Sequence, residues 1–161
     1  MIKRILIFTI SSISILFTTL AWSYDEELAK SYAELFSEVK GEKAGKYLHF
    51  VIPHKFVKDI KSGKEMVVID VRTPSETELF SMTSEKNLKI TANEIFQPEN
   101  LKRIPTDKEV IVICKSGARA TAIGTGLRHI GFDNVYILKG GFEDLSAYYG
   151  TREANHKPKE W

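Results

Sequence analysis

The segment Val110-Ile-Val-Ile-Cys114-Lys-Ser-Gly-Ala-Arg119 gives the clearest indication of the fold. Residues 110–114 are apolar at every position, which predicts a strand buried on both faces, as in a parallel sheet covered by helices. A helix is predicted directly after the loop, with Gly131 as its C-terminal cap. Its buried stripe is predicted to consist of Ala120, Ile123, Leu127 and Ile130. A strand that leads into a helix through a short loop is the repeating unit of an α/β fold.

The same alternation continues on both sides of this unit. Strands are predicted at Leu48 to Ile52, Met66 to Val71, Leu88 to Thr91 and Val135 to Leu138, and helices at Pro53 to Lys61, Ser75 to Phe80 and Asn93 to Leu101. Strands that alternate with helices give βαβ units, so we expect an open parallel α/β sheet with helices on both faces. Ligands of such sheets bind beyond the carboxyl ends of the strands, which is where Cys114 stands.

The first 23 residues have the features of a signal peptide. Lys3 and Arg4 precede an apolar run, and the small residues Ala21 and Ser23 stand three and one positions before a cut after Ser23. An uncleaved membrane anchor is the alternative, because the run approaches the minimum spanning length. Serines and threonines within the run favour cleavage. We therefore expect a periplasmic or secreted protein with no stable membrane insertion after cleavage.

The remaining chain is divided into three parts. Residues 24–46 are expected to form a helical extension, 47–150 the α/β domain, and 151–161 a mobile tail. In the extension, Leu28, Tyr32, Leu35, Phe36 and Val39 recur at helical spacing between Asp25 and Lys40. We expect this additional N-terminal helix to lie against the domain, and a partner-binding helix is the alternative.

Composition restricts the range of partners and cofactors. The 161 residues carry a formal net charge of +2, and removal of residues 1–23 deletes two basic residues and no acidic one. Such a balance argues against nucleic acid as a partner, and a monomer is the default expectation for so small a domain. His49, His54, His129 and His156 show no metal-ligand spacing, so neither a metal nor another cofactor is expected.

The chemistry is expected at Cys114, which is the only cysteine and so cannot form an intramolecular disulfide. A buried, inert thiol is the general alternative for a cysteine at the end of a strand. Here the loop Lys115, Ser116, Gly117, Ala118 and Arg119 leads into a helix, and its backbone N–H groups can point at one anion. Lys115 and Arg119 add positive charge that favours a thiolate, Gly117 permits an unusual backbone conformation, and Ser116 offers a hydroxyl. The loop therefore predicts a nucleophilic sulfur.

Three segments together resemble the rhodanese family. They are Cys114 to Arg119, Ile69-Asp-Val-Arg-Thr-Pro-Ser-Glu76 and Val135-Tyr-Ile-Leu-Lys-Gly-Gly-Phe142, and the resemblance spans about Leu48 to Ala147. It implies a sulfurtransferase in which Cys114 takes a sulfane sulfur from thiosulfate or a similar donor and holds it as a persulfide. Cyanide, a small thiol or a protein would accept the sulfur.

The resemblance also bears on residues other than Cys114. It implies that Arg119 braces the loop, and we expect Asp70 to support the site through hydrogen bonds and Arg72 through an ion pair. Rhodaneses usually carry a Gly-His-Ile-Pro-Gly-Ala stretch after the Asp-Val-Arg segment. Residues Ser81 to Thr91 hold no His, Pro or Gly, so one side of the pocket departs from the family.

Two other functions compete with this interpretation. Phosphatases and arsenate reductases also place a cysteine and an arginine around an anion, but with five residues between them, whereas this chain has the four from Lys115 to Ala118. The shorter loop suits a sulfur atom better than a tetrahedral phosphate. The second alternative is a non-enzymatic persulfide carrier or a redox-sensing module.

Overall fold

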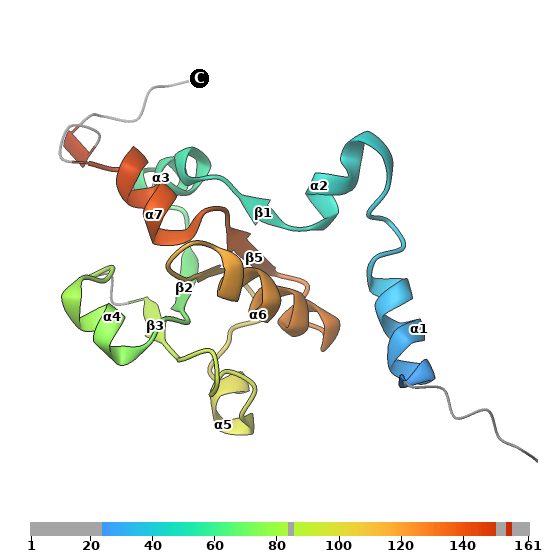
Figure 1. The fold of residues 1–161 in the computed structure, drawn as a ribbon. Helices are drawn as coiled ribbons and strands as arrows, with labels where there is room; N and C mark the ends of the chain where they lie inside the picture. The colour runs from blue at the N-terminus through green and yellow to red at the C-terminus, as the bar shows by residue number, and fades with distance from the viewer. Residues whose placement is uncertain (1–23, 84–85, 151–153, 156–161) are drawn as a thin grey trace, which may run out of the picture.

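The computed structural model describes residues 24–83, 86–150 and 154–155, and it contains a five-stranded parallel sheet in the order β1-β5-β4-β2-β3 (Figure 1). The strands are β1 Phe50–Val51, β2 Met66–Asp70, β3 Asn87–Lys89, β4 Glu109–Ile113 and β5 Val135–Leu138. The helices are α1 Glu26–Leu35, the 3-10 turn η1 Gly41–Lys43, α2 Ala44–Tyr47, α3 Pro53–Lys61, α4 Pro74–Leu79, α5 Pro98–Leu101, α6 Ala118–His129 and α7 Gly141–Tyr148. The predicted parallel α/β fold is confirmed.

The two central strands bring the predicted site residues to one edge of the sheet. Asp70 of β2 stands beside Ile113 of β4 in the parallel register, and the Val71 N–H donates to the Ile113 carbonyl oxygen at 2.9 Å. Parallel strands end at the same edge, so Cys114 and the residues that follow β2 lie at one edge of the sheet.

Each face of the sheet is covered by helices, as expected. Successive residues of a strand point to opposite faces. Val112 and Cys114 therefore pack with α6, while Ile111 and Ile113 pack with α3 and α7. α6 approaches the sheet closely, because a Cβ atom built at Gly124 would lie 2.6 Å from Cγ1 of Ile137.

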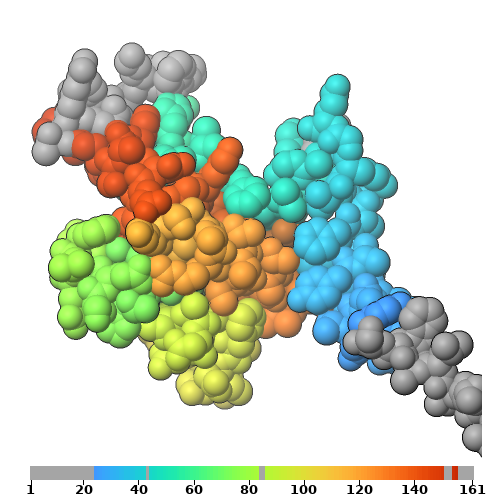
Figure 2. Space-filling view, in the orientation of Figure 1, coloured from blue at the N-terminus to red at the C-terminus, as the bar shows by residue number. Residues whose placement is uncertain are grey.

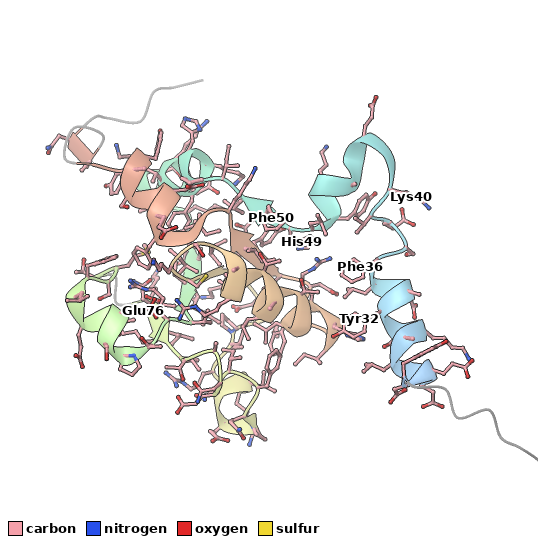
Figure 3. The ribbon with its side chains drawn as sticks, viewed as in Figure 1. Tyr32, Phe36, Lys40, His49, Phe50 and Glu76 are labelled. Atoms are coloured by element: carbon pink, nitrogen blue, oxygen red, sulfur yellow. The ribbon has the colours of Figure 1, made fainter. Side chains whose placement is uncertain are left out.

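The N-terminal segment differs from its prediction. α1 ends at Leu35 rather than Lys40, and the side chains predicted to pack on the domain are largely solvent-exposed, with Leu28 at 50%, Tyr32 at 38% and Phe36 at 40%. α1 meets α6 where the Tyr32 ring lies 4.0 Å from the His129 ring, and otherwise residues 24–47 form a lobe at the side of the domain (Figures 2 and 3). Residues 36–38 form a turn, and 39–40 are irregular, in place of the last predicted helical turn.

Three further details inside the domain differ from the prediction. Ile130 was assigned to the buried stripe of α6, but it caps the helix and is 53% exposed. Helix α7 was not predicted, because the two glycines that begin it indicate a turn rather than a helix. In the structure Gly140 and Gly141 have positive φ and lead directly into this helix, with Phe142 and Leu145 buried. The short helix predicted over Asn93 to Leu101 is limited to α5, at Pro98–Leu101.

Some predictions concern residues that the structure leaves undescribed. The predicted signal peptide, 1–23, lies outside the described residues, as does the predicted tail except residues 154–155. Among the described residues, no helix combines the length and apolar character needed to cross a bilayer.

Candidate active site

The sulfur of Cys114 lies at the start of α6 and accepts two backbone hydrogen bonds. The Gly117 N–H donates to Sγ at 3.2 Å, and the Ala120 N–H donates at 3.4 Å. The whole residue is 1% exposed. Both donors belong to the first residues around the helix N-terminus, where backbone N–H groups lack intrahelical partners and the helix dipole is positive. The predicted orientation of loop amides toward position 114 is thus present.

Two glycines allow the loop to lie tightly against the beginning of α7. Gly117 has a φ of +90°, and a Cβ atom there would lie 3.1 Å from the Gly140 nitrogen. At Gly141, with φ +59°, a Cβ atom would stand 2.4 Å from the Cys114 carbonyl oxygen. This contact is too short for any side chain. Glycine at positions 117 and 141 is therefore required by the close approach of two backbones.

The start of α7 anchors the loop through its own backbone. The Phe142 N–H donates to the Cys114 carbonyl oxygen at 2.9 Å, and the Glu143 N–H donates to the Lys115 carbonyl oxygen at 3.0 Å. These bonds turn the loop carbonyls toward α7 and away from the sulfur. The N–H groups on the other side of the loop are left to point toward Sγ.

The remaining loop side chains are mostly exposed. The Lys115 ammonium lies 3.5 Å from the Glu143 carboxylate, and both side chains are more than half exposed. Ser116 and Ala118 are also exposed, and Ala118 is the first residue of α6. Lys115 is therefore placed to attract an anion from solvent while the backbone surrounds the sulfur.

Arg119 is held by Glu76, a residue to which the sequence assigned no role. Its two terminal nitrogens donate to the two Glu76 carboxylate oxygens at 2.6 and 2.8 Å. The hydrogen bond from Arg119, aided by the Thr73 N–H, lowers the pKa of Glu76 to about 2. In turn the hydrogen bond to Glu76 raises the pKa of Arg119, with a smaller contribution from the Cys114 side chain. The carboxylate of Glu76, which is labelled in Figure 3, therefore links α4 to the loop 114–119.

A local signal could have identified Glu76. Thr73-Pro74-Ser75-Glu76 is a capping box, in which the Thr73 side chain accepts from the Glu76 N–H and the Glu76 side chain accepts from the Thr73 N–H. The capping bond fixes the carboxylate at the start of α4. What the pattern could not reveal is that Arg119, 43 residues later, meets that carboxylate.

Asp70 and Arg72 form a buried ion pair beneath the loop. The Arg72 Nη2 donates to Asp70 Oδ2 at 2.8 Å, and the two side chains are 2% and 6% exposed. The guanidinium also donates to the Phe80 carbonyl oxygen at 2.8 Å and lies 3.8 Å from the centre of the Phe142 ring. A buried charge needs several polar partners, because burial removes the water that would otherwise solvate it. The pair connects β2, the segment after α4, and α7.

The segment that departs from the family pattern, residues 81–91, still contains a strand. β3 pairs with β2 in parallel over Asn87–Lys89, one residue earlier than predicted, and the Ile90 N–H donates to the Asp70 carbonyl oxygen at 3.2 Å. Within the described residues, no cluster of three or more His, Cys, Asp or Glu side chains could hold a metal ion.

Comparison with known proteins agrees with this geometry. A family model of the rhodanese-like domain matches residues 53–148. The thiosulfate sulfurtransferase GlpE of Coxiella burnetii is 27% identical over 104 residues, which cover 65% of this chain and 94% of that protein. The chloroplastic rhodanese-like/PpiC domain-containing protein 12 of Arabidopsis thaliana is 29% identical over 93 residues, or 58% of this chain. That match spans only 31% of the plant protein, so the chain corresponds to less than a third of its length.

The fold agrees with solved structures as well. A rhodanese-related protein from Thermoplasma volcanium superposes with a TM-score of 0.53 at 26% identity, over 62% of this chain and 92% of that one. The family model covers more than half of the chain and includes the Cys114 loop, the capping box at Thr73 and the Gly-Gly turn. Relatives named as sulfurtransferases support sulfur transfer at the level of the family. The chain belongs to the rhodanese-like family.

Proposed function

We propose that this protein is a sulfurtransferase that carries the transferred sulfur as a persulfide on Cys114. The donor is thiosulfate or a compound like it, and the acceptor is thiophilic: cyanide, a small thiol or a protein thiol. The family supports sulfur transfer, and the geometry around Cys114 supports this residue as the carrier.

Two displacements at sulfur make up the reaction. The Cys114 thiolate attacks the outer sulfur of thiosulfate, the sulfur–sulfur bond of the donor breaks, and sulfite leaves with the electron pair. A persulfide anion remains on the enzyme. The acceptor then attacks the outer sulfur of the persulfide, and Cys114 leaves as a thiolate. With cyanide the product is thiocyanate, and two such half-reactions give ping-pong kinetics.

One observation carries this proposal: the Gly117 and Ala120 N–H groups already point at Sγ in the free protein. Donors fixed before reaction stabilise a negatively charged sulfur without the cost of reorienting solvent. Cys114 is 1% exposed, so a slender donor that presents its sulfane sulfur first is favoured over a bulky one. Lys115 lies at the exposed side of the loop, where its charge attracts an anionic donor.

Intact mass measurement after incubation with thiosulfate tests the proposal. We expect the protein to gain the mass of one sulfur atom, and we expect Cys114→Ser to gain none. Lys115→Ala should slow the gain, whereas Lys102→Ala, a change of the same charge outside the loop, should not. If wild type and Cys114→Ser behave alike, the assignment of Cys114 is wrong.

Steady-state thiocyanate formation separates an enzyme from the alternatives. An enzyme forms thiocyanate repeatedly, while a carrier takes up one sulfur and releases it only to a dedicated partner. A redox-sensing thiol would be oxidised by peroxide without taking sulfur from thiosulfate. Turnover of an aryl phosphate would instead support a phosphatase, against which the loop of four residues between Cys114 and Arg119 argues.

We also propose that the protein acts outside the cytoplasm as a monomer. The proposal rests on the sequence of residues 1–23, whose charged start, apolar run and small residues suit a cleaved export signal. Sequencing the N-terminus of protein isolated from the producing cell tests it. A chain that begins at Tyr24 is expected, and one that still begins at Met1 contradicts cleavage. Sedimentation equilibrium tests the assembly state.

A further inference from the structure

An apolar cavity of about 480 Å³ lies on the α3 and α7 side of the sheet, opposite the face toward which the Cys114 side chain packs. Its walls come from α3, from residues 80–83 and from α7 with its capping residue Tyr149. α3 and α7 lie side by side (Figure 1). Among the described residues that line the cavity, none belongs to the loop 114–119. The cavity is therefore separate from the candidate active site.

The size and lining of this cavity suit a small apolar molecule. Small-molecule sites in proteins measure about 300–1,000 Å³ and are mostly apolar with a few polar groups. The large side chains here are those of Phe56, Ile60, Phe80, Met82, Phe142 and Leu145. None of the described lining residues carries a charge. Because an unpaired charge is costly to bury, the part of a ligand that enters this cavity is uncharged.

A polar group without a partner stands next to the cavity. Ser81, Met82 and Phe142 line both the cavity and a tighter hollow, whose lining also includes Asn87 of β3 and the charged residues Asp70 and Lys89. The Asn87 Nδ2 and Oδ1 atoms are both buried, and within the described part of the chain neither has a hydrogen-bond partner. Buried amides are almost always paired, because an unpaired donor or acceptor retains its full desolvation cost.

The Asn87 side chain also restricts the kind of ligand. Its amide presents an N–H donor and a carbonyl acceptor side by side. A ligand group that accepts from the first and donates to the second is itself an amide or a hydroxyl, whereas a carboxylate leaves the Asn87 oxygen unpaired. Met82, which stands between cavity and hollow, is unbranched and only partly buried, so it can turn aside to admit such a group.

We propose that this cavity is a binding site for an uncharged small molecule with an apolar body and an amide or hydroxyl end. The body packs between α3 and α7, against Phe80, Phe142 and Leu145, and the polar end pairs with the Asn87 amide. The segment that forms one wall, residues 80–83, overlaps the region that departs from the rhodanese pattern. This site is independent of sulfur transfer at Cys114.

Binding of N-phenyl-1-naphthylamine, an uncharged apolar molecule with one N–H group, tests the cavity. We expect saturable one-to-one binding to the full chain, seen as increased probe fluorescence. Ser146→Phe fills the mouth from the exposed side of α7 and should weaken binding at least about tenfold. Ala147→Phe places the same side chain on the next exposed residue, which does not line the cavity, and should leave binding unchanged. Absence of saturable binding, or equal binding by both variants, overturns the proposal.

Displacement of the probe tests the role of Asn87. Octanamide should displace it at a concentration about three to ten times lower than octanoate, the range expected for one hydrogen-bonded pair. Asn87→Leu should still bind the probe but should no longer distinguish the two competitors. Equal displacement from wild type contradicts the pairing with Asn87. Cys114→Ser should bind probe and octanamide as wild type does, so failure here is distinguishable from failure of the proposed sulfurtransferase.

Discussion

The loop 114–119 and the N-terminal lobe, residues 24–47, are attached to the same domain in different ways. The loop 114–119 is fixed by backbone bonds from α7, by the capped carboxylate of Glu76 and by the donors around Sγ. The lobe, residues 24–47, meets α6 through His129, whose Nε2 lies 2.8 Å from Ser31 Oγ and whose ring contacts Tyr32. Figure 2 shows this lobe at the side of the domain.

This contrast indicates which part of the protein is held most rigidly. Donors stabilise an anionic sulfur only if their positions are fixed before the charge arrives. Fixing a backbone segment opposes its conformational entropy, so every such segment needs several contacts to hold it. Within the described residues, the loop 114–119 has several such contacts, whereas the lobe meets α6 through His129. Changes near the loop should therefore affect the whole domain, and changes in the lobe should remain local.

The largest effect is expected from breaking the buried pair beneath the loop. Arg72→Met leaves the Asp70 carboxylate buried without its main partner, and it should lower the free energy of unfolding by about 3–5 kcal/mol. Urea denaturation measures this change. The double variant Asp70→Leu/Arg72→Met removes both charges and should recover a large part of the loss. A single variant whose free energy of unfolding stays within about 1 kcal/mol of wild type would contradict the expected contribution of this pair.

A smaller but still global effect is expected at the contact between loop and α7. Gly141→Ala places a Cβ atom 2.4 Å from the Cys114 carbonyl oxygen at a φ of +59°. Gly63→Ala is the matched control, because Gly63 has a φ of +76° and no atom within 4 Å of the added Cβ. The control should cost about 1–2 kcal/mol for the left-handed backbone alone. Gly141→Ala should exceed it by at least about 1 kcal/mol in the same denaturation experiment; equal costs would mean that the two backbones can separate freely.

The ion pair between Glu76 and Arg119 should contribute less, and in a pH-dependent way. Because the pKa of Glu76 is lowered from 4.5 to about 2, its stabilising contribution is complete above pH 4.5 and is lost as the pH falls toward 2. Both side chains are about one-third exposed, so we expect a contribution of only about 1 kcal/mol or less.

Glu76→Gln tests this contribution. The variant should be less stable than wild type at pH 7, and the difference should shrink as the pH approaches 2. Unfolding free energies measured across this range provide the check. The variant should also take up sulfur from thiosulfate more slowly at pH 7, since Arg119 loses its anchor. A stability difference that grows toward low pH has the wrong sign for the proposed pair.

The smallest effect is expected in the lobe. Tyr32→Ala removes the ring that meets His129, but Tyr32 is already 38% exposed, so the loss in global stability should stay below about 1 kcal/mol. Hydrogen exchange should instead become faster in residues 26–35 and stay unchanged in the loop. Phe36→Ala is the control, because the Phe36 ring has similar exposure, 40%, and stacks on Tyr32 rather than on His129. It should change exchange in residues 26–35 less than Tyr32→Ala does. Faster exchange at Gly117 in Tyr32→Ala would contradict the separation of lobe and loop.

Much of the domain could be predicted because its signals are local. The apolar runs of β2 and β4, the proline at the start of α3 and the glycine after α6 each indicate an element from a few neighbouring residues. The loop of donors after Cys114 could be predicted for the same reason, since a strand that leads into a helix leaves N–H groups without partners.

The predictions were wrong where a local sequence pattern carries no information about the parts of the fold that lie next to it. Helical spacing in 25–40 indicates an apolar face but not whether the domain offers a surface to cover it, and most of that face stayed exposed. Gly140 and Gly141 have the composition of a turn, yet the approach of the Cys114 backbone requires glycine at the start of α7.

The amino-acid sequence by itself indicated the alternation of strands and helices and the loop of N–H groups after Cys114, because each depends on residues close together in the chain. The assembled fold was needed to show that Glu76 meets Arg119, that Arg72 lies against two aromatic rings and that an unpaired Asn87 lines a hollow next to an apolar cavity. These features join segments far apart in the sequence. Their energies come from desolvation and close packing, which exist only once the layers of the fold have assembled.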